Sequence, residues 1–147
     1  MSYSIGEVSK KLNIPASTIR YYDKEGLLPF IERKESGIRT FSENDLKMLE
    51  IIECLKNTGM PIKDIKVFSD CCAKGDNSLE ERYNMFLDRK KIVEEQMAKL
   101  QESLDIINYK CWYYKTALEA GTEKIHEDIN TKDIASIVSK KKEEGLL

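Results

Sequence analysis

The sequence predicts a mainly α-helical protein in which several short helices and a pair of short strands precede one long helix. Three observations support this fold class. Helix start and stop signals are closely spaced in the first half, a β-prone stretch surrounds a polar glycine-containing loop, and an apolar seven-residue repeat follows. We therefore expect a compact domain at 1–75, a dimerisation helix at 76–120 and a carboxy-terminal tail at 121–147.

The first elements are marked by their capping residues. Ser4 with Glu7 three positions later forms a capping box, which predicts the start of a first helix. Pro15 suits the first position of a second helix. The residues at 29–41 are predicted to form a wing, two short strands around the polar loop at 34–37.

Two further helices follow the wing. Ser42 with Asp45 forms a second capping box and predicts a third helix that ends at Gly59. Pro61 and Gly75 bracket a fourth helix, with proline at its start and glycine past its end.

The second half is dominated by one uninterrupted helix. Ser78 with Glu81 predicts another capping box, and neither proline nor glycine occurs again before Gly121. Twelve residues follow a strict four-three spacing, and only Lys90 among them is polar: Leu79, Tyr83, Phe86, Lys90, Val93, Met97, Leu100, Leu104, Ile107, Cys111, Tyr114 and Leu118. Such a repeat is typical of a coiled-coil seam. A helix of roughly 60 Å, at about 1.5 Å per residue, cannot bury this stripe against a small domain, so we expect a homodimer.

The stretch from Ser17 to Phe41 has the layout of a helix-turn-helix followed by a wing, which is a surface that binds duplex DNA. Ser17 and Thr18 lie near the amino end of the second helix, where hydroxyls and free backbone N–H groups meet phosphates or base edges. The residues predicted to contact DNA are Ser17, Thr18, Arg20, Tyr21 and Lys24 from the helix, with Arg33 and Arg39 from the wing. Their neighbours Ile19, Tyr22, Leu27 and Leu28 are predicted to be core.

Composition limits the other possibilities. Acidic and basic residues nearly balance, with a formal net charge of -2, so DNA binding must rely on a few well-placed groups. No stretch is apolar enough to span a membrane, and no signal peptide is recognised. The four cysteines lack a disulfide framework. Together these observations predict a cytoplasmic protein. An enzyme is not expected, because the single histidine, His126, lies in a polar tail without a nucleophile motif. A coiled-coil interaction protein would leave the predicted DNA-binding motif without a purpose.

These motifs resemble those of the MerR family of transcriptional regulators. The match runs from residue 3 to about 119, and its specific motifs are Arg20-Tyr21-Tyr22, Gly26-Leu27-Leu28, Arg33 and Gly37-Ile38-Arg39-Thr40-Phe41. The family's usual wing tyrosine is Phe41 here. The resemblance implies a winged helix-turn-helix and an antiparallel coiled-coil dimer. It also implies a palindromic promoter with an overlong spacer, which the dimer bends and untwists so that RNA polymerase can use it.

The same resemblance indicates what kind of signal the regulator is expected to detect. Metal-sensing members carry a cysteine near the start of the long helix and a cysteine-bearing loop after it, whereas this chain has Arg82 and Tyr83 at the first place and no cysteine at the second. A metal site needs several convergent sulfur or imidazole ligands, so neither a metal nor another cofactor is expected. The chain also ends before the separate carboxy-terminal drug-binding domain of some relatives.

Cys54 is the candidate sensor. The segments at 51–59, 36–39 and 73–76 resemble the NmlR/AdhR-like branch, in which modification of a cysteine at the matching place by an aldehyde or another electrophile activates transcription. The opposing interpretation is a half-buried apolar cysteine, consistent with Ile51 and Leu55 beside it. The helix macrodipole also disfavours a thiolate late in a helix. Cys71 and Cys72 are secondary thiol candidates, and Cys111 is interpreted as filler on the seam.

The aromatic residues near the end of the long helix suggest a second possible signal, an apolar small molecule. Trp112, Tyr113 and Tyr114 are expected to pack, or else to line a pocket for an apolar small molecule between the long helix and the DNA-binding lobe. The tail is predicted to contain a short amphipathic helix that begins at Thr131 and docks on the dimer.

Overall fold

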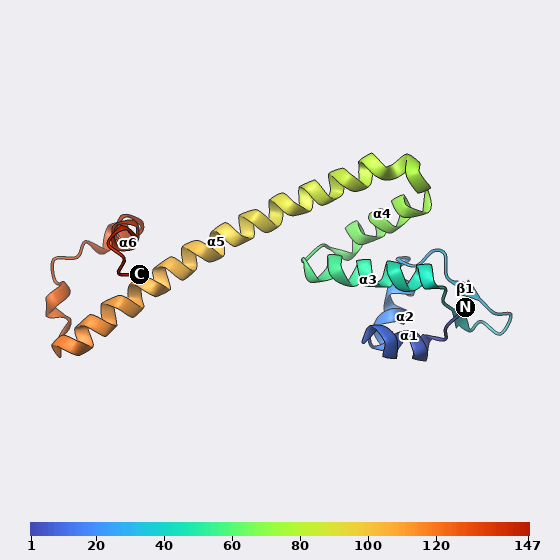
Figure 1. Cartoon of the computed structure of the whole chain (residues 1–147), viewed down its shortest axis with the longest axis horizontal. Coiled ribbons are helices and arrows are strands. Elements are labelled where there is room, and N and C mark those ends of the chain that lie inside the picture. The colour runs from blue at the N-terminus through green and yellow to red at the C-terminus, as the bar shows by residue number, and fades with distance from the viewer. The chain divides into compact units, whose positions relative to one another are not determined.

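The computed structural model describes all of residues 1–147, and the chain divides into two compact units, Met1–Lys91 and Ile92–Leu147 (Figure 1). The elements in chain order are α1 (Ile5–Leu12), α2 (Ala16–Lys24), β1 (Glu32–Arg33), β2 (Arg39–Thr40), α3 (Glu43–Asn57), α4 (Ile62–Ala73), α5 (Leu79–Ala120) and α6 (Ile134–Glu143), with 3-10 turns at Gly75–Ser78, Glu123–His126 and Thr131–Asp133. Helix α5 begins in the first unit and continues through the second. The predicted mainly helical fold, with a two-stranded wing and one long helix, is confirmed.

The predicted caps explain where the early helices begin. The hydroxyl of Ser4 accepts from the backbone N–H of Glu7, whose carboxylate accepts from the backbone of Ser4, and Ser42 and Asp45 repeat this arrangement at α3. The reciprocal bonds satisfy N–H groups that the first turn leaves without partners. Pro15 and Pro61 lie one position earlier than predicted, because each is the N-cap residue of its helix.

The predicted capping box at Ser78 is wrong. The 3-10 turn runs directly into α5, and the N–H of Leu79 already bonds to the carbonyl of Asp76. The Ser78 hydroxyl instead donates to the carbonyl of Cys71 and, at 2.9 Å, to that of Gly75. Ser78 therefore joins the end of α4 to the start of α5.

The core of the first unit lies among α1, α2, α3, α4 and the base of the wing. Its buried residues are Val8, Ile14, Ile19, Tyr22, Leu27, Leu28, Phe41, Leu46, Leu49, Ile52, Leu55, Met60, Ile65 and Phe68. The four residues predicted to be core beside the DNA-contacting positions are all among them. The wing is an antiparallel pair in which Glu32 faces Thr40 and Arg33 faces Arg39, and Tyr3 adds a bridge to Phe41.

The second unit is built from the rest of α5 and the returning tail. Its buried residues are Tyr109 and Ala117 of α5 with His126 and Val138 of the tail. Helix α6 is the predicted short helix, but Thr131 does not begin it. The side chain of Asp133 caps α6 by accepting from the N–H of Ser136, and Asn130 caps the 3-10 turn before it.

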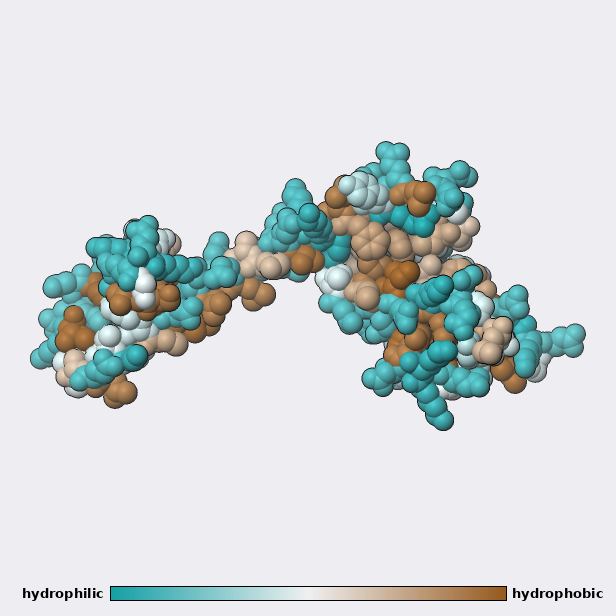
Figure 2. Space-filling model, viewed as in Figure 1, coloured by the Kyte–Doolittle hydropathy of each residue, from teal (hydrophilic) through white to brown (hydrophobic).

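The predicted seam of α5 is exposed in the single chain. Figure 2 shows apolar side chains, in brown, along α5. The most exposed members of the seam are Leu100 at 70% and Leu118 at 83%. None of the helices combines the length and apolar character that a membrane span requires.

Candidate nucleic-acid interface

Helix α2 presents one polar face and one buried face. Ser17, Arg20, Tyr21 and Lys24 are exposed, and their spacing of three and four residues places them on the same side of the helix. Thr18 is half-buried. Ile19 and Tyr22 are buried and anchor the opposite side. The helix therefore offers two cations, a hydroxyl and a phenol to a partner without any rearrangement of its core.

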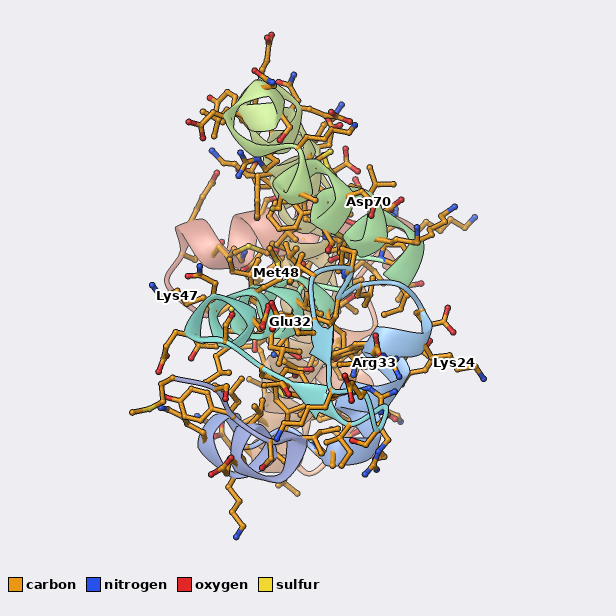
Figure 3. The ribbon with its side chains drawn as sticks, turned by 90° about the vertical axis from the view of Figure 1, so that its right-hand side faces the viewer. Lys24, Glu32, Arg33, Lys47, Met48 and Asp70 are labelled. Atoms are coloured by element: carbon orange, nitrogen blue, oxygen red, sulfur yellow. The ribbon has the colours of Figure 1, made fainter.

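The wing arginines are held against α2 by Asp23, a residue that sequence reasoning did not single out. The Nη2 atom of Arg33 and the Nε atom of Arg39 lie 2.5 Å and 2.6 Å from the same oxygen, Oδ2 of Asp23. The Asp23 side chain is 12% exposed, while those of Arg33 and Arg39 are 51% and 23% exposed. In Figure 3, Lys24 extends outward on the side of the unit where Arg33 lies. The bonds place Arg33, Arg39 and α2 in one surface.

The loop of the wing is a tight turn that leaves its tip exposed. The N–H of Gly37 donates to the carbonyl of Lys34 at 2.8 Å, and Gly37 has a φ of +81°, which favours glycine. Lys34 and Ile38 are both exposed there. The tip therefore adds one cation and one apolar side chain to the surface made by α2 and the wing.

The buried side of α2 is joined to α3 by one polar contact. The Tyr22 hydroxyl donates to the carboxylate of Glu53, and the Lys56 ammonium lies 5.5 Å from the centre of the Tyr22 ring. Burial raises the pKa of Tyr22, and the bond to Glu53 raises it further. The phenol therefore stays protonated and remains a donor at neutral pH.

The four cysteines are free and lie in different surroundings. Cys54 is exposed on α3, immediately after Glu53, so the interpretation of a half-buried side chain is wrong. Cys71 is buried, and this burial raises the pKa of its thiol, with a further rise from Glu81, so it is not an accessible thiol. Cys72 is partly buried against the core, and Cys111 is exposed on α5. No three His, Cys, Asp or Glu side chains converge in a way that could hold a metal ion.

The aromatic cluster of the second unit packs around His126. The imidazole lies 4.4 Å from the Tyr113 ring and 5.0 Å from the Trp112 ring, between centroids, and its Nε2 atom is 2.7 Å from the hydroxyl of Thr116. Tyr114 is exposed instead. A cavity of about 490 Å³ adjoins this cluster, and its lining includes Trp112, Ile125, His126, Ile129, Ile137, Lys140 and Lys141.

Comparison with known proteins identifies the family. Residues 3–70 match the model of the MerR HTH family regulatory proteins. An HTH-type transcriptional regulator of Haemophilus influenzae, itself uncharacterized, is 44% identical over 124 residues, which are 84% of this chain and 92% of that protein. The chain belongs to the MerR family. It is a regulator of that family and not an enzyme.

Two further relatives refine this assignment within the MerR family. The crystal structure of HiNmlR, a MerR family regulator lacking the sensor domain and bound to promoter DNA, has a TM-score of 0.68 and 44% identity, and covers 85% of this chain and 99% of that one. AdhR of Bacillus subtilis is 37% identical over 92 residues, 62% of this chain and 66% of AdhR. The predicted resemblance to the NmlR/AdhR-like branch is confirmed.

The MerR match covers the candidate interface. All seven residues predicted to contact DNA, together with Asp23 and Cys54, fall within residues 3–70. The cavity near Trp112 lies outside that range, in the second unit. The part of the chain that defines the family is therefore the part that carries α2, the wing and α3.

Proposed function

We propose that this chain is a transcriptional regulator that binds a palindromic promoter as a homodimer and activates transcription by distorting the spacer DNA. The observation that carries the proposal is the single surface on which Arg20, Tyr21 and Lys24 of α2 lie beside the arginines that Asp23 holds. Such a surface suits a helix in the major groove with a wing on the phosphate backbone. The promoter complex of HiNmlR supports the same partner.

The exposed seam of α5 supports the homodimer. Soluble monomers rarely expose a long contiguous apolar stripe, and a second copy of the same helix offers a matching one. In an antiparallel coiled coil, the two copies of α2 are related by a two-fold axis. A two-fold protein matches a palindromic site, whose half-sites are separated by the distance between the recognition helices.

Activation through DNA shape follows from this geometry. Two surfaces fixed to one dimer can bind both half-sites of an overlong spacer only if the DNA bends or untwists, and the protein contacts offset the deformation energy. The promoter elements on either side then align for RNA polymerase. We therefore propose that the protein acts in the cytoplasm.

We propose that the signal is an aldehyde or another electrophile that reacts with Cys54. The thiolate sulfur forms a bond to the carbonyl carbon, the C=O π electrons move to oxygen, and that oxygen takes a proton from water. The exposure of Cys54 supports this chemistry, as does the resemblance of residues 51–59 to the NmlR/AdhR-like branch. The alternative is an apolar small molecule that binds without a covalent bond. Its candidate site is the cavity beside Trp112, which lies within the second unit and is lined by both apolar and charged residues.

The DNA-binding part of the proposal is tested with Arg20→Ala. Loss of an exposed arginine from the groove-facing side of α2 is expected to weaken binding to the cognate promoter about 10- to 100-fold, in line with about 1–3 kcal/mol for one base contact. Binding is measured by fluorescence anisotropy across a range of salt concentrations. Lys63→Ala, an exposed cation on α4, is the control and should bind as the parent does. Equal affinities for all three proteins would rule out α2 as the reading helix.

The signal is tested by transcription in vitro with the parent protein and Cys54→Ser, with and without formaldehyde. We expect formaldehyde to activate transcription with the parent and to have no effect with Cys54→Ser. An equal response of the two proteins would reject Cys54 as the sensor. Ile129→Lys places a charge in the cavity beside Trp112 and tests the non-covalent alternative. If Cys54 is the sensor, this variant should keep the formaldehyde response.

A further inference from the structure

The carboxy-terminal half of α3 is bonded at two points to neighbouring helices. Glu53 accepts a hydrogen bond from the hydroxyl of Tyr22 on α2, and the carbonyl of Thr58 accepts one from the Nη2 atom of Arg89 on α5. Cys54 lies between these two points, next to Glu53 and four residues before Thr58. We call residues 53–58 the linking segment. It is a stretch of one helix that touches both the predicted reading helix and the start of the helix that bears the seam.

The contact with Tyr22 leads directly to the candidate interface. Tyr22 is fully buried in the core of the first unit, so its ring is held by the residues packed around it. Its neighbours in sequence are Tyr21, on the exposed face, and Asp23, which holds both wing arginines. A displacement of Glu53 therefore reaches the groove-facing side chains and the wing through a single hydrogen bond.

The contact with Arg89 fixes the other end of the linking segment. The N–H of Thr58 bonds to the carbonyl of Cys54 at 3.1 Å, so the last turn of α3 connects the two residues directly. A cation at a helix carboxy-terminus is favoured by the macrodipole. Gly59 has a φ of +84°, which favours glycine, and a Cβ atom there would lie 2.9 Å from Nη2 of Arg89, so another residue would displace the guanidinium.

We propose that Glu53 and Arg89 are positioning residues that transmit a change at Cys54 to α2 and to the start of α5. The inference rests on the proposed function in one respect, that Cys54 is the place where the signal acts. An adduct on Cys54 is expected to displace the linking segment, which carries both acceptors, the side-chain carboxylate of Glu53 and the backbone carbonyl of Thr58. The two bonds therefore bias the position of the reading helix relative to α5.

The first experiment measures hydrogen exchange in the free protein after Cys54 is labelled with N-ethylmaleimide. The background carries Cys72→Ser and Cys111→Ser, while Cys71 is buried and is kept. We expect the label to raise exchange of the amides at 16–24 about fivefold, the change that loss of one hydrogen bond produces in a local opening equilibrium. In Tyr22→Phe, exchange should be raised before labelling, and the label should add little.

The conservative variant Glu53→Gln separates positioning from a simple loss of packing. Glutamine keeps a side-chain oxygen that accepts from Tyr22, so this variant should respond to the label as the parent does, whereas Glu53→Ala should behave like Tyr22→Phe. The inference is overturned if the label leaves α2 exchange unchanged in the parent. It is overturned equally if the label raises exchange to the same extent in Tyr22→Phe.

The role of Arg89 has a matched control in Arg82. Both arginines lie near the start of α5 and donate to a backbone carbonyl, and each has a buried Nε atom without a partner. The bond of Arg89 ends at Thr58, the C-cap residue of α3, whereas the bond of Arg82 ends at the carbonyl of Gly75, at 3.0 Å. We expect Arg89→Met to remove the effect of the label on exchange at 79–91 and Arg82→Met to keep it. The same result from both variants would contradict the assignment of Arg89, and Arg89→Lys replaces Arg89→Met if the latter does not fold.

The exchange measurement uses neither DNA nor aldehyde, so it is independent of the tests of the proposed function. If Cys54→Ser still responds to formaldehyde while the label changes α2 exchange only when Tyr22 and Glu53 are intact, the sensor assignment fails and the coupling stands. If formaldehyde acts through Cys54 and the label acts equally in all variants, the sensor stands and the coupling fails.

Discussion

The two units of the chain place similar apolar residues in opposite environments. In the first unit, Leu49 and Ile65 are fully buried among residues of the same chain. In the second, Leu100 and Leu118 of α5 are among the most exposed large apolar side chains of the protein. The periodicity of the apolar residues is helical in both cases, so the difference does not come from local structure. It shows that one surface is closed within a single chain and the other is not.

The second unit buries the side of α5 that bears Tyr109, while the seam on another side of the same helix stays exposed. Tyr109 is 1% exposed, and it follows the seam residue Ile107 by two positions, which is about 200° around a helix. The tail adds Val138 to that side and ties Lys142 to Asp105 at 2.5 Å. The tail therefore covers the back of α5 and leaves the seam exposed, as the proposed homodimer requires.

The largest effect is expected from a substitution in the buried core of the first unit. Leu49→Ala removes a fully buried side chain and should lower the free energy of unfolding by about 2–5 kcal/mol, as a cavity in a packed core does. Urea denaturation measures this loss. Val67→Ala, in the exposed face of α4, is the control and should cost much less. If both variants lose the same stability, the first unit does not close its core within one chain.

The exposed apolar seam of α5 is tested by placing a charge on it. Leu100→Lys puts two cations into the symmetric dimer, one from each copy, and should weaken association by about 2–4 kcal/mol, given about 2 kcal/mol for each buried leucine. Sedimentation equilibrium at several concentrations measures the dissociation constant. Ala98→Lys adds the same charge off the seam and should remain dimeric. A parent protein that sediments as a monomer at micromolar concentration would contradict the seam itself.

How much could be predicted from the sequence differs between these surfaces for a physical reason. Helix starts and the seam depend on residues three or four positions apart, so Ser4, Ser42 and the four-three repeat sufficed to predict them. The wrong prediction at Ser78 arose because the same residue pattern also suits a turn that runs straight into a helix, as it does here.

The contacts that organise the candidate interface join residues far apart in the chain. Asp23 meets the wing across 10 and 16 residues, and Tyr22 meets Glu53 across 31. No local pattern marks such pairs, and Asp23 looks like an ordinary surface carboxylate in the sequence. The seven residues predicted to contact DNA were chosen from helical spacing and the family motif, whereas Asp23, which bonds to two of them, was missed.

The smallest effect is expected for a substitution of Asp23. This residue is expected to hold the wing arginines against α2 before any partner binds. In Asp23→Asn, a neutral amide replaces the carboxylate whose Oδ2 atom accepts from both arginines, so both bonds lose their charge assistance. We expect affinity for the cognate promoter to fall by about 1 kcal/mol, while binding to unrelated DNA is kept, because the variant also removes a negative charge near the phosphates. Competition binding measures the ratio of the two affinities. Asp70→Asn, which changes an exposed carboxylate paired with Lys66 on α4, is the matched control and should leave that ratio unchanged. A ratio that is unchanged in Asp23→Asn as well would mean that DNA itself, and not Asp23, positions the wing.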